Sequence, residues 1–282
     1  MTGRGPTPEG ERTTKGAPPA RAGLELLVTC EHGGNRVPEE YAPLFAGAAE
    51  LLESHRGFDA GALDVARALA ARLGARLIAA ETTRLLVDLN RSPRHPRLFS
   101  ELTRGLPPER KRTLLADHYA PYRQAVESVV AAAAGAGRFL LHVSSHSFVP
   151  VLDGVERKAE IGLLFDPRRP AEASFAAAWR SALRKAAPAW SVRRNYPYRG
   201  VADGLTTHLR RRFADAAYAG LELEVNQRLV TDPAWTAHVK TIAAALGRAV
   251  DELRAMPCAG KVRSPKMPRT PPMRRSSTPK VR

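Results

Sequence analysis

Short apolar runs alternate with longer amphipathic stretches over most of this chain. The short runs predict strands at 24–29, 76–80, 84–89, 139–144, 161–165 and 221–225. The amphipathic stretches predict helices at 59–74, about 108–134, 172–187, 203–213 and 232–255. Because strands and helices alternate, the pattern predicts an α/β sandwich with a largely parallel sheet.

Individual residues predict where some of these elements begin and break. Asp232 and Pro233 provide an N-cap and a first-turn proline for the last helix. Asp203 is a candidate cap for the helix predicted over 203–213. Pro121 predicts an interruption of the long helix. The Ser144-Ser145 pair suggests a turn at the end of the fourth strand.

The two ends of the chain are rich in Pro, Gly, Ser and Thr and have no apolar periodicity. Such segments cannot offset the entropy cost of an ordered backbone, so we expect residues 1–22 and 257–282 to be disordered and 23–256 to form one domain. Much of the net charge of +16 belongs to the ends, because residues 257–282 carry eight basic and no acidic side chains. Without aromatic residues to stack on bases, this basic tail predicts at most sequence-independent, salt-dependent contact with nucleic acid.

The same sequence predicts a cytoplasmic protein without a membrane partner. Its longest apolar runs are far shorter than the roughly 18 to 20 residues that span a bilayer, and the polar N-terminus lacks the apolar segment of a signal peptide. Two cysteines, Cys30 and Cys258, cannot form a disulfide framework, which is consistent with a reducing compartment.

Histidines lie at the ends of two predicted core strands. His32 follows the first strand and precedes Gly33-Gly34, and His146 follows the strand that contains His142. Ligands of open α/β sheets bind at such strand ends, and two imidazoles with one carboxylate make a zinc site that leaves a position open for water. Each histidine could instead be an ordinary core residue. We favour His146 as a ligand because it lies beyond the strand, and expect His142 to support the site or the core.

A carboxylate ligand and a proton acceptor are also candidates from the sequence. Asp59, in a Gly-rich segment before a helix, could complete the metal site, although a simple N-cap is the alternative. In the last predicted strand, the alternation of residues 221–225 puts Glu222 and Glu224 on one face. That face could be half-solvated, but burial within a covered sheet would raise the carboxyl pKa into the range useful for acid and base catalysis. Glu224, nearer the strand's carboxyl end, is the better candidate.

Arginines could bind a substrate carboxylate or a developing oxyanion. Most of the many arginines must simply be solvated. We favour Arg84 and Arg91, because they flank the apolar run that contains Asp88. Asp88 could pair with one of them in a structural role.

Five short motifs in register resemble the N-formylglutamate amidohydrolase family from about residue 24 to 232. They are His32-Gly33-Gly34 with Val37-Pro38, Arg56-Gly57-Phe58-Asp59-Ala60-Gly61-Ala62, Val87-Asp88-Leu89-Asn90-Arg91, His146-Ser147-Phe148 and Leu223-Glu224-Val225-Asn226-Gln227-Arg228. The tails lie outside the resemblance.

The resemblance implies a zinc-dependent amidase with a three-layer fold, a mixed sheet between helices, similar to the zinc carboxypeptidases and zinc N-acetylmuramoyl amidases. By position, His32, Asp59 and His146 look like the metal ligands and Glu224 like the carboxylate that transfers protons. The implied reaction is hydrolysis of the amide of N-formyl-L-glutamate to glutamate and formate, a late step of histidine degradation.

The segment 195–207 looks like the family's substrate-side loop, which makes Asn195, Tyr198, Arg199 and Thr206 candidate substrate-binding residues. In the histidine-pathway enzymes an arginine follows the threonine, but here that position is Thr207. N-formylglutamate is therefore a default substrate. The alternatives are a zinc peptidase or another N-acyl amidase of the same fold, and, from a different class, a nucleic-acid-binding protein that uses the basic tail. The sequence leaves the oligomeric state open.

Overall fold

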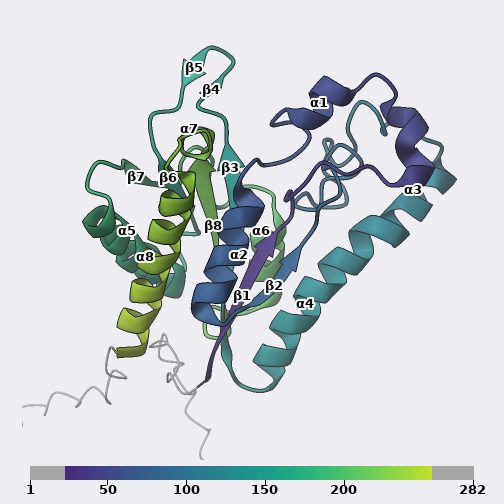
Figure 1. Ribbon diagram of the computed structural model, residues 1–282. Helices are drawn as coiled ribbons and strands as arrows, with labels where there is room; N and C mark the ends of the chain where they lie inside the picture. Colours follow the sequence, from purple (N-terminus) through teal and green to yellow (C-terminus); the bar gives the residue numbers. More distant parts are fainter. Residues whose placement is uncertain (1–22, 256–282) are drawn as a thin grey trace, which may run out of the picture.

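A computed structural model describes residues 23–255, and its centre is a six-stranded sheet with the strand order β2-β1-β3-β8-β6-β7 (Figure 1). The strands are β1 (Leu24–Cys30), β2 (Arg76–Ala79), β3 (Phe139–Phe148), β6 (Ile161–Leu164), β7 (Val192–Arg194) and β8 (Tyr218–Asn226). Strands β2, β1, β3 and β8 are parallel neighbours, whereas β6 pairs antiparallel with β8 and parallel with β7. The predicted mixed, mostly parallel sheet is confirmed.

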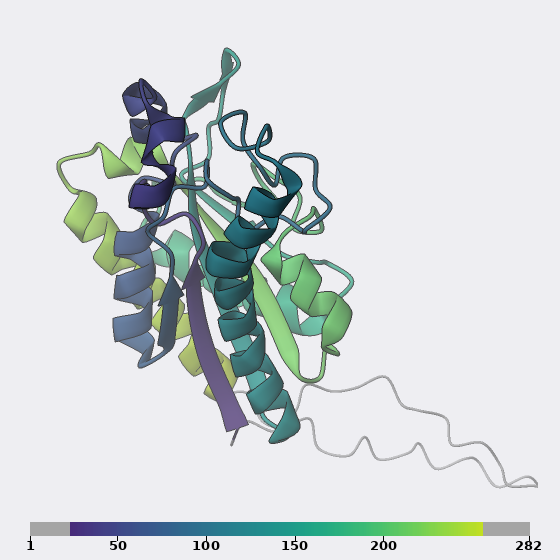
Figure 2. The ribbon, with the colours of Figure 1, turned by 90° about the vertical axis from the view of Figure 1, so that its right-hand side faces the viewer.

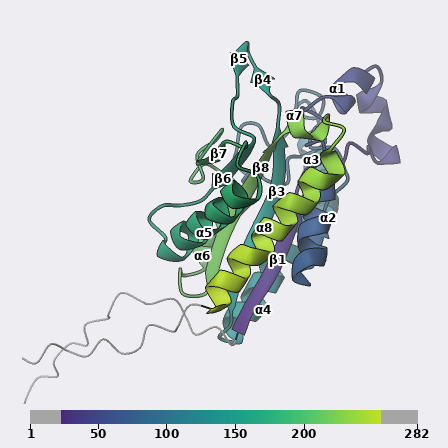
Figure 3. The ribbon, with the colours of Figure 1, turned by 60° about the vertical axis from the view of Figure 1, so that its left-hand side comes forward.

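Helices cover both faces of this sheet and form two separate apolar cores. The helices are α1 (Ala49–Glu53), α2 (Ala62–Leu73), α3 (Pro108–Leu114), α4 (Ala120–Gly135), α5 (Pro170–Ala186), α6 (Leu205–Arg212), α7 (Gln227–Val230) and α8 (Trp235–Ala255), with a 3-10 helix η2 (Glu39–Phe45). Helices α2, α5 and α8 enclose one core and α4 and α6 the other. Seen along the sheet edge, α2 and α8 lie on one side and α4 and α6 on the other, which gives the predicted three layers (Figure 2). Helix α8 lies in front of the sheet and packs against both α5 and α2 (Figure 3).

The period-2 pattern of β8 sorts its side chains between the core and the opposite face. Leu221, Leu223 and Val225 are fully buried in the first core. Each such side chain contributes about 1.5–3 kcal/mol through the hydrophobic effect. Glu222 and Glu224 share the other face, as the alternation predicts.

The long helix predicted over 108–134 is interrupted where Pro121 requires it. Helix α3 passes into a π-helical turn, η3 (Leu115–Tyr119), and α4 begins with Pro121 in its first turn. Proline lacks the backbone N–H that a helix interior needs, so the first turn after a break accommodates it.

Three local predictions are wrong. Residues 84–89 form turns instead of a strand, and their apolar side chains are buried within the second core, to which α4 and α6 also contribute. Ser144 and Ser145 continue β3 without a turn, and both are buried. Asp203 does not cap α6, because the N-cap of that helix is Gly204. Oδ2 of Asp203 instead accepts a hydrogen bond from the Ser92 N–H.

The pattern also missed short elements that carry little apolar periodicity. The hairpin of β4 (Val151–Leu152) and β5 (Val155–Glu156) projects beyond the sheet near α7 (Figure 1). Strand β7 and helices η2 and α1 were likewise not predicted.

None of the helices between residues 23 and 255 combines the length and the apolar character that a membrane span requires. Residues 1–22 and 256–282 lie outside the described part of the chain. The expected disorder of both ends, the domain limits at 23 and 256, and any role of the basic tail therefore stay predictions.

Candidate metal centre and active site

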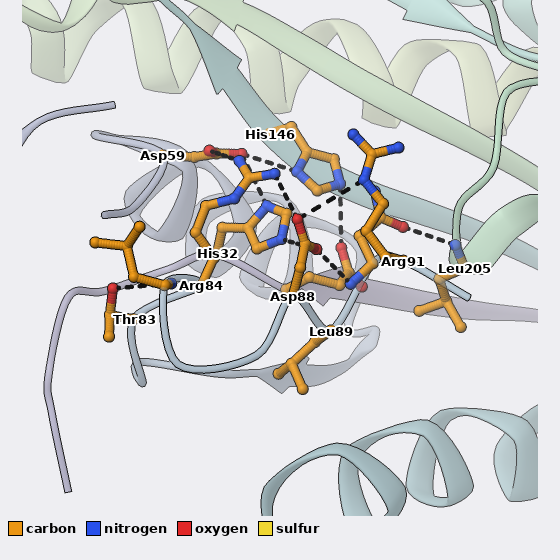
Figure 4. Close-up of polar contacts among 12 residues, drawn as sticks. His32, Asp59, Thr83, Arg84, Asp88, Leu89, Arg91, His146 and Leu205 are labelled. Carbon is orange, nitrogen blue, oxygen red and sulfur yellow. Dashed lines mark hydrogen bonds and ion pairs between the residues drawn. The ribbon is translucent and has the colours of Figure 1, made fainter. Parts of the chain in front are cut away.

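His32, Asp59 and His146 converge at the carboxyl edge of the sheet (Figure 4). One ligand atom from each lies within 4.8 Å of the others, and all three residues are buried. Oδ2 of Asp59 is 2.9 Å from Nδ1 of His146 and 3.4 Å from Nδ1 of His32. The arrangement provides two imidazole nitrogens and a carboxylate oxygen, which is the donor set of a zinc site with an open position.

Neighbouring parallel strands bring the two histidines together. Strands β1 and β3 are paired through Thr29 and Ser144, so the turn after β1 carries His32 to the same edge that His146 reaches on β3. The glycine after this turn is needed for close backbone packing, because a Cβ on Gly34 would lie 2.6 Å from the carbonyl oxygen of Glu81. The neighbouring chain segment, rather than a ligand, thus explains this glycine.

Asp59 is held in place by its backbone and leaves its side chain free for the site. Its N–H donates to the carbonyl of His32 at 2.9 Å. Helix α2 begins after Asp59, with Gly61 as its N-cap at a φ of 75°. The alternative interpretation of Asp59 as an N-cap is therefore wrong.

A carboxylate binds the far nitrogen of each imidazole. Nε2 of His32 lies 2.8 Å from Asp88, and Nε2 of His146 lies 3.1 Å from Glu31 and 2.9 Å from the Ser144 hydroxyl. Histidine ligands of metals are commonly oriented by such carboxylates, which fix the tautomer and increase the basicity of the other nitrogen. Both Nδ1 atoms are consequently directed at Asp59 and the point between them.

The charges around this point keep the carboxylates ionised. Burial alone would raise the pKa of Asp59, but His32 and Arg84 hold it well below its usual range. Burial would also raise the pKa of Asp88, but Arg84 and His32 hold it well below its usual range. The pKa of Glu31 is likewise lowered despite burial, because the carboxylate contacts His146 and Ser144. At His146, where burial alone would lower the pKa, Asp59 and Glu31 raise it well above its usual range. Ionised carboxylates beside two imidazoles fit a divalent cation.

Glu224 lies beside His146, because the two residues are paired in the register of β3 and β8. Its side chain is buried, and its Oε2 atom has no hydrogen-bond partner among the described residues. Burial raises the pKa of Glu224 to about 8, with Asp59 and Glu222 adding to the effect against His146 and Arg84. A carboxyl group with these properties is suited to accept and return a proton.

The His-Asp-His group and Glu224 line a cleft of about 860 Å³. Both favoured arginines line it, but each is engaged by neighbours (Figure 4). Arg84 donates to Asp59 at 3.0 Å and to Asp88 at 2.8 Å. Arg91 donates to the carbonyl of Asp203, and its Nε is 3.8 Å from Asp88. Asp88 thus pairs with both arginines as well as with His32, which exceeds the single structural pair that the sequence suggested.

The predicted substrate-side loop lies only partly in the cleft. Tyr198 and Arg199 line it. The side chain of Asn195 instead accepts hydrogen bonds from the N–H groups of Phe165 and Gly200, which closes the loop. Thr206 does not line the cleft, but its hydroxyl donates a hydrogen bond to Glu222, which does. The Thr207 hydroxyl donates to the carbonyl of Ala202.

His142 lies behind the site, as expected. It shares a face of β3 with His146 but is four residues deeper, where it contacts the hydroxyls of Thr29 and Tyr218 at 2.8 and 2.9 Å. Burial lowers the pKa of His142 to about 4. It is therefore a neutral core residue outside the His-Asp-His group.

Sequence reasoning missed Glu31 and Arg157. Glu31 directly precedes a candidate ligand, but nothing in the local pattern separates it from a solvated glutamate. Arg157 directly follows the unpredicted β4–β5 hairpin and lines the cleft. Its proximity to the site depends on chain contacts that no periodicity reports.

Comparison with known proteins supports the relationship that the motifs suggest. A family model described as N-formylglutamate amidohydrolase matches residues 24–231. A gene product of Agrobacterium tumefaciens with a solved structure is 29% identical with a TM-score of 0.68, over 83% of this chain and 92% of that one. An N-formylglutamate amidohydrolase from Ralstonia eutropha JMP134 is 17% identical with a TM-score of 0.62, over 83% and 96%, which shows a shared fold. The sequence matches no curated protein.

Proposed function

We propose that this chain, which belongs to the N-formylglutamate amidohydrolase family, is a zinc-dependent enzyme that hydrolyses N-acyl amino acids. Amide hydrolysis follows from the family. The metal, the acyl group and the amino acid are the proposed part, and N-formyl-L-glutamate is the default substrate.

The observation that carries the proposal is the position of Glu224 beside the His-Asp-His group. Three buried donors lie within 4.8 Å of one another, and a buried carboxyl with an unpartnered oxygen is paired in register with one of them. A catalytic metal site needs an open position and a nearby proton acceptor: three protein ligands would leave a tetrahedral position open, and Glu224 would be the acceptor.

His32, Asp59 and His146 would hold the ion through Nδ1, Oδ2 and Nδ1. When bound, zinc supplies Lewis-acid chemistry, which activates water at neutral pH and polarises a carbonyl. Asp88 and Glu31 keep the two imidazoles in the tautomer that leaves Nδ1 free to coordinate.

Glu224 would take the proton of the attacking water and deliver it to the amine nitrogen as the amide C–N bond breaks. Its desolvated position raises the pKa of Glu224, and this higher proton affinity favours the first transfer, from the water to the carboxylate. Arg84 and Arg91 are proposed to stabilise the developing oxyanion or a substrate carboxylate. Arg84 has a side chain only 24% exposed and already holds Asp59 and Asp88, so it also positions the site.

The cleft favours a substrate class broader than N-formylglutamate. N-formylglutamate has about a dozen non-hydrogen atoms, whereas clefts of about 300–1,000 Å³ hold drug-sized ligands. With Thr207 in place of the arginine of the histidine-pathway enzymes, longer N-acyl groups and short peptides are the alternatives. A cytoplasmic role in histidine degradation depends on the default substrate and stays a prediction.

A metal analysis and a substrate panel test the proposal. The purified protein should contain about one zinc per chain, and it should hydrolyse N-formyl or longer N-acyl amino acids until a chelator removes the metal. Glu224→Gln should retain zinc and lose about 10²- to 10⁴-fold in kcat. Near-full activity of Glu224→Gln would contradict the role of Glu224 in proton transfer. Activity that persists with chelator present would contradict the role of the metal.

A further inference from the structure

Arg157 follows the β4–β5 hairpin and lies against two aromatic rings of the cleft. Its guanidinium carbon is 5.8 Å from the ring centre of Phe148 and 5.2 Å from that of Tyr198. Its Nη1 donates to the Tyr198 hydroxyl at 3.1 Å. All three residues line the cleft that contains Glu224. Contacts with two rings and a hydrogen bond to one of them restrict the orientation of the guanidinium.

The backbone of Arg157 is attached to the strand that carries Glu224. The Asn226 side chain, at the end of β8, donates to the carbonyls of Arg157 and Ala159, each at 2.9 Å. The Arg228 guanidinium donates to the same Arg157 carbonyl. Although Arg157 comes from a segment between short strands, its position is thus coupled to the proposed proton acceptor.

The charge of Arg157 is not neutralised by the protein. Within residues 23–255, no carboxylate forms an ion pair with its guanidinium, whereas Arg84 pairs with Asp59 and Asp88. Burial and the guanidinium groups of Arg56, Arg84 and Arg157 lower the pKa of His55, which also lines the cleft. Arg157 therefore contributes uncompensated positive charge to the space where substrate binds.

We propose that Arg157 is a specificity-determining residue that binds a carboxylate of the substrate. This inference rests on the proposed function, because it takes the cleft as the binding site of an N-acyl amino acid. The planar guanidinium offers donors beyond the one used by Tyr198, and a carboxylate can accept two of them side by side. The contacts with Phe148 and Tyr198 hold the guanidinium in place before the carboxylate binds, so less side-chain entropy is lost on binding.

The test compares ligands that differ in a single charge. The zinc-loaded Glu224→Gln enzyme, with and without Arg157→Gln, is titrated by calorimetry with N-formyl-L-glutamate and its two monoamides, N-formyl-L-glutamine and N-formyl-L-isoglutamine. Arg157→Gln should lower the binding affinity for the diacid and for one monoamide about 10- to 100-fold. The affinity for the other monoamide should fall less than about threefold. Arg157→Lys should recover part of the loss, because it keeps the charge without the fork.

Arg193→Gln is the matched control. Arg193 also lies over a ring, 5.1 Å from the centre of Tyr196, but it is outside the cleft, so its removal should leave every affinity unchanged. Equal losses for all three ligands in Arg157→Gln, or no loss, would overturn the inference, as would the absence of binding by all three. If the ligands bind with the expected pattern but the zinc-loaded wild-type enzyme hydrolyses no N-acyl amino acid, the proposed function fails and the anion site stands.

Discussion

Nε2 of His146 lies 3.1 Å from Glu31, on the opposite side of the imidazole from Asp59. Glu31 is fully buried and also accepts hydrogen bonds from the hydroxyls of Ser144 and Tyr122, at 2.6 and 3.0 Å. These contacts fix the carboxylate, which in turn fixes the ring. The orientation of one proposed metal ligand thus depends on a residue that does not touch the metal position.

Glu31→Gln should weaken zinc binding about 10- to 100-fold, as the loss of carboxylate partners of metal-bound histidines commonly does. The amide retains the shape of the side chain but not its charge, so Nδ1 of His146 becomes a poorer donor. Competition titration with a chromophoric chelator measures the change. Glu109→Gln, in an exposed pair with Arg112, is the control, and an equal zinc affinity of Glu31→Gln and wild type would contradict the positioning role.

Removal of the metal should lower the thermal stability of the protein. A ligand present at about 1,000 times its Kd stabilises the folded state by about 4 kcal/mol, if it binds the native state alone. Zinc should therefore raise the Tm of the chelator-treated protein. His32→Ala should abolish that increase, because it removes one of the three donors. An undiminished zinc-dependent shift in His32→Ala would place the ion elsewhere.

Glu224 should make the metal-free protein less stable as the pH rises from about 4.5 to about 8. Its pKa is about 8 in the folded chain and 4.5 in the unfolded reference, so over this interval the unfolded state releases a proton that the folded state keeps. Stability then falls with pH by up to about 1.4 kcal/mol per unit and levels off above pH 8.

The Glu224→Gln variant isolates this contribution, because glutamine does not titrate. The free energy of unfolding of the variant, measured with urea in the presence of chelator, should equal that of wild type near pH 4. It should exceed the wild-type value by a growing amount up to pH 8. Parallel stability curves for the two proteins would show that the Glu224 pKa is not raised.

Glu172 should be essential for stability rather than catalysis. It is fully buried and accepts hydrogen bonds from Arg210 and from the N–H groups of Asp166 and Gly220, and Arg169 lies 3.2 Å away. Glu172→Ala leaves buried guanidinium groups uncompensated, which costs about 3–5 kcal/mol.

Denaturant unfolding measures this loss. Glu109→Ala, which breaks an exposed pair, should change the free energy of unfolding by less than about 1 kcal/mol. A similarly small change for Glu172→Ala would mean that the two arginines find other partners.

The sequence by itself determined the layer architecture and much of the candidate site. Alternating apolar runs predict the sheet and its covering helices, and the carboxyl ends of parallel strands meet at one edge, so His32 and His146 could be placed there from chemistry and position. The period of two in β8 was enough to direct Glu224 away from the core. These inferences depend on local periodicity, which survives in the fold because each element buries one face.

Only the tertiary structure decided which side chains hold that site in place. The largely apolar run 84–89 looks like a strand, but in the second core it forms turns that carry Asp88 to His32 and Arg84 to Asp59. The Glu31–His146 contact joins residues far apart in the chain, and Arg157 reaches the cleft through Asn226. Burial, pairing and pKa at these residues arise from long-range contacts, which local hydrophobic patterns do not encode.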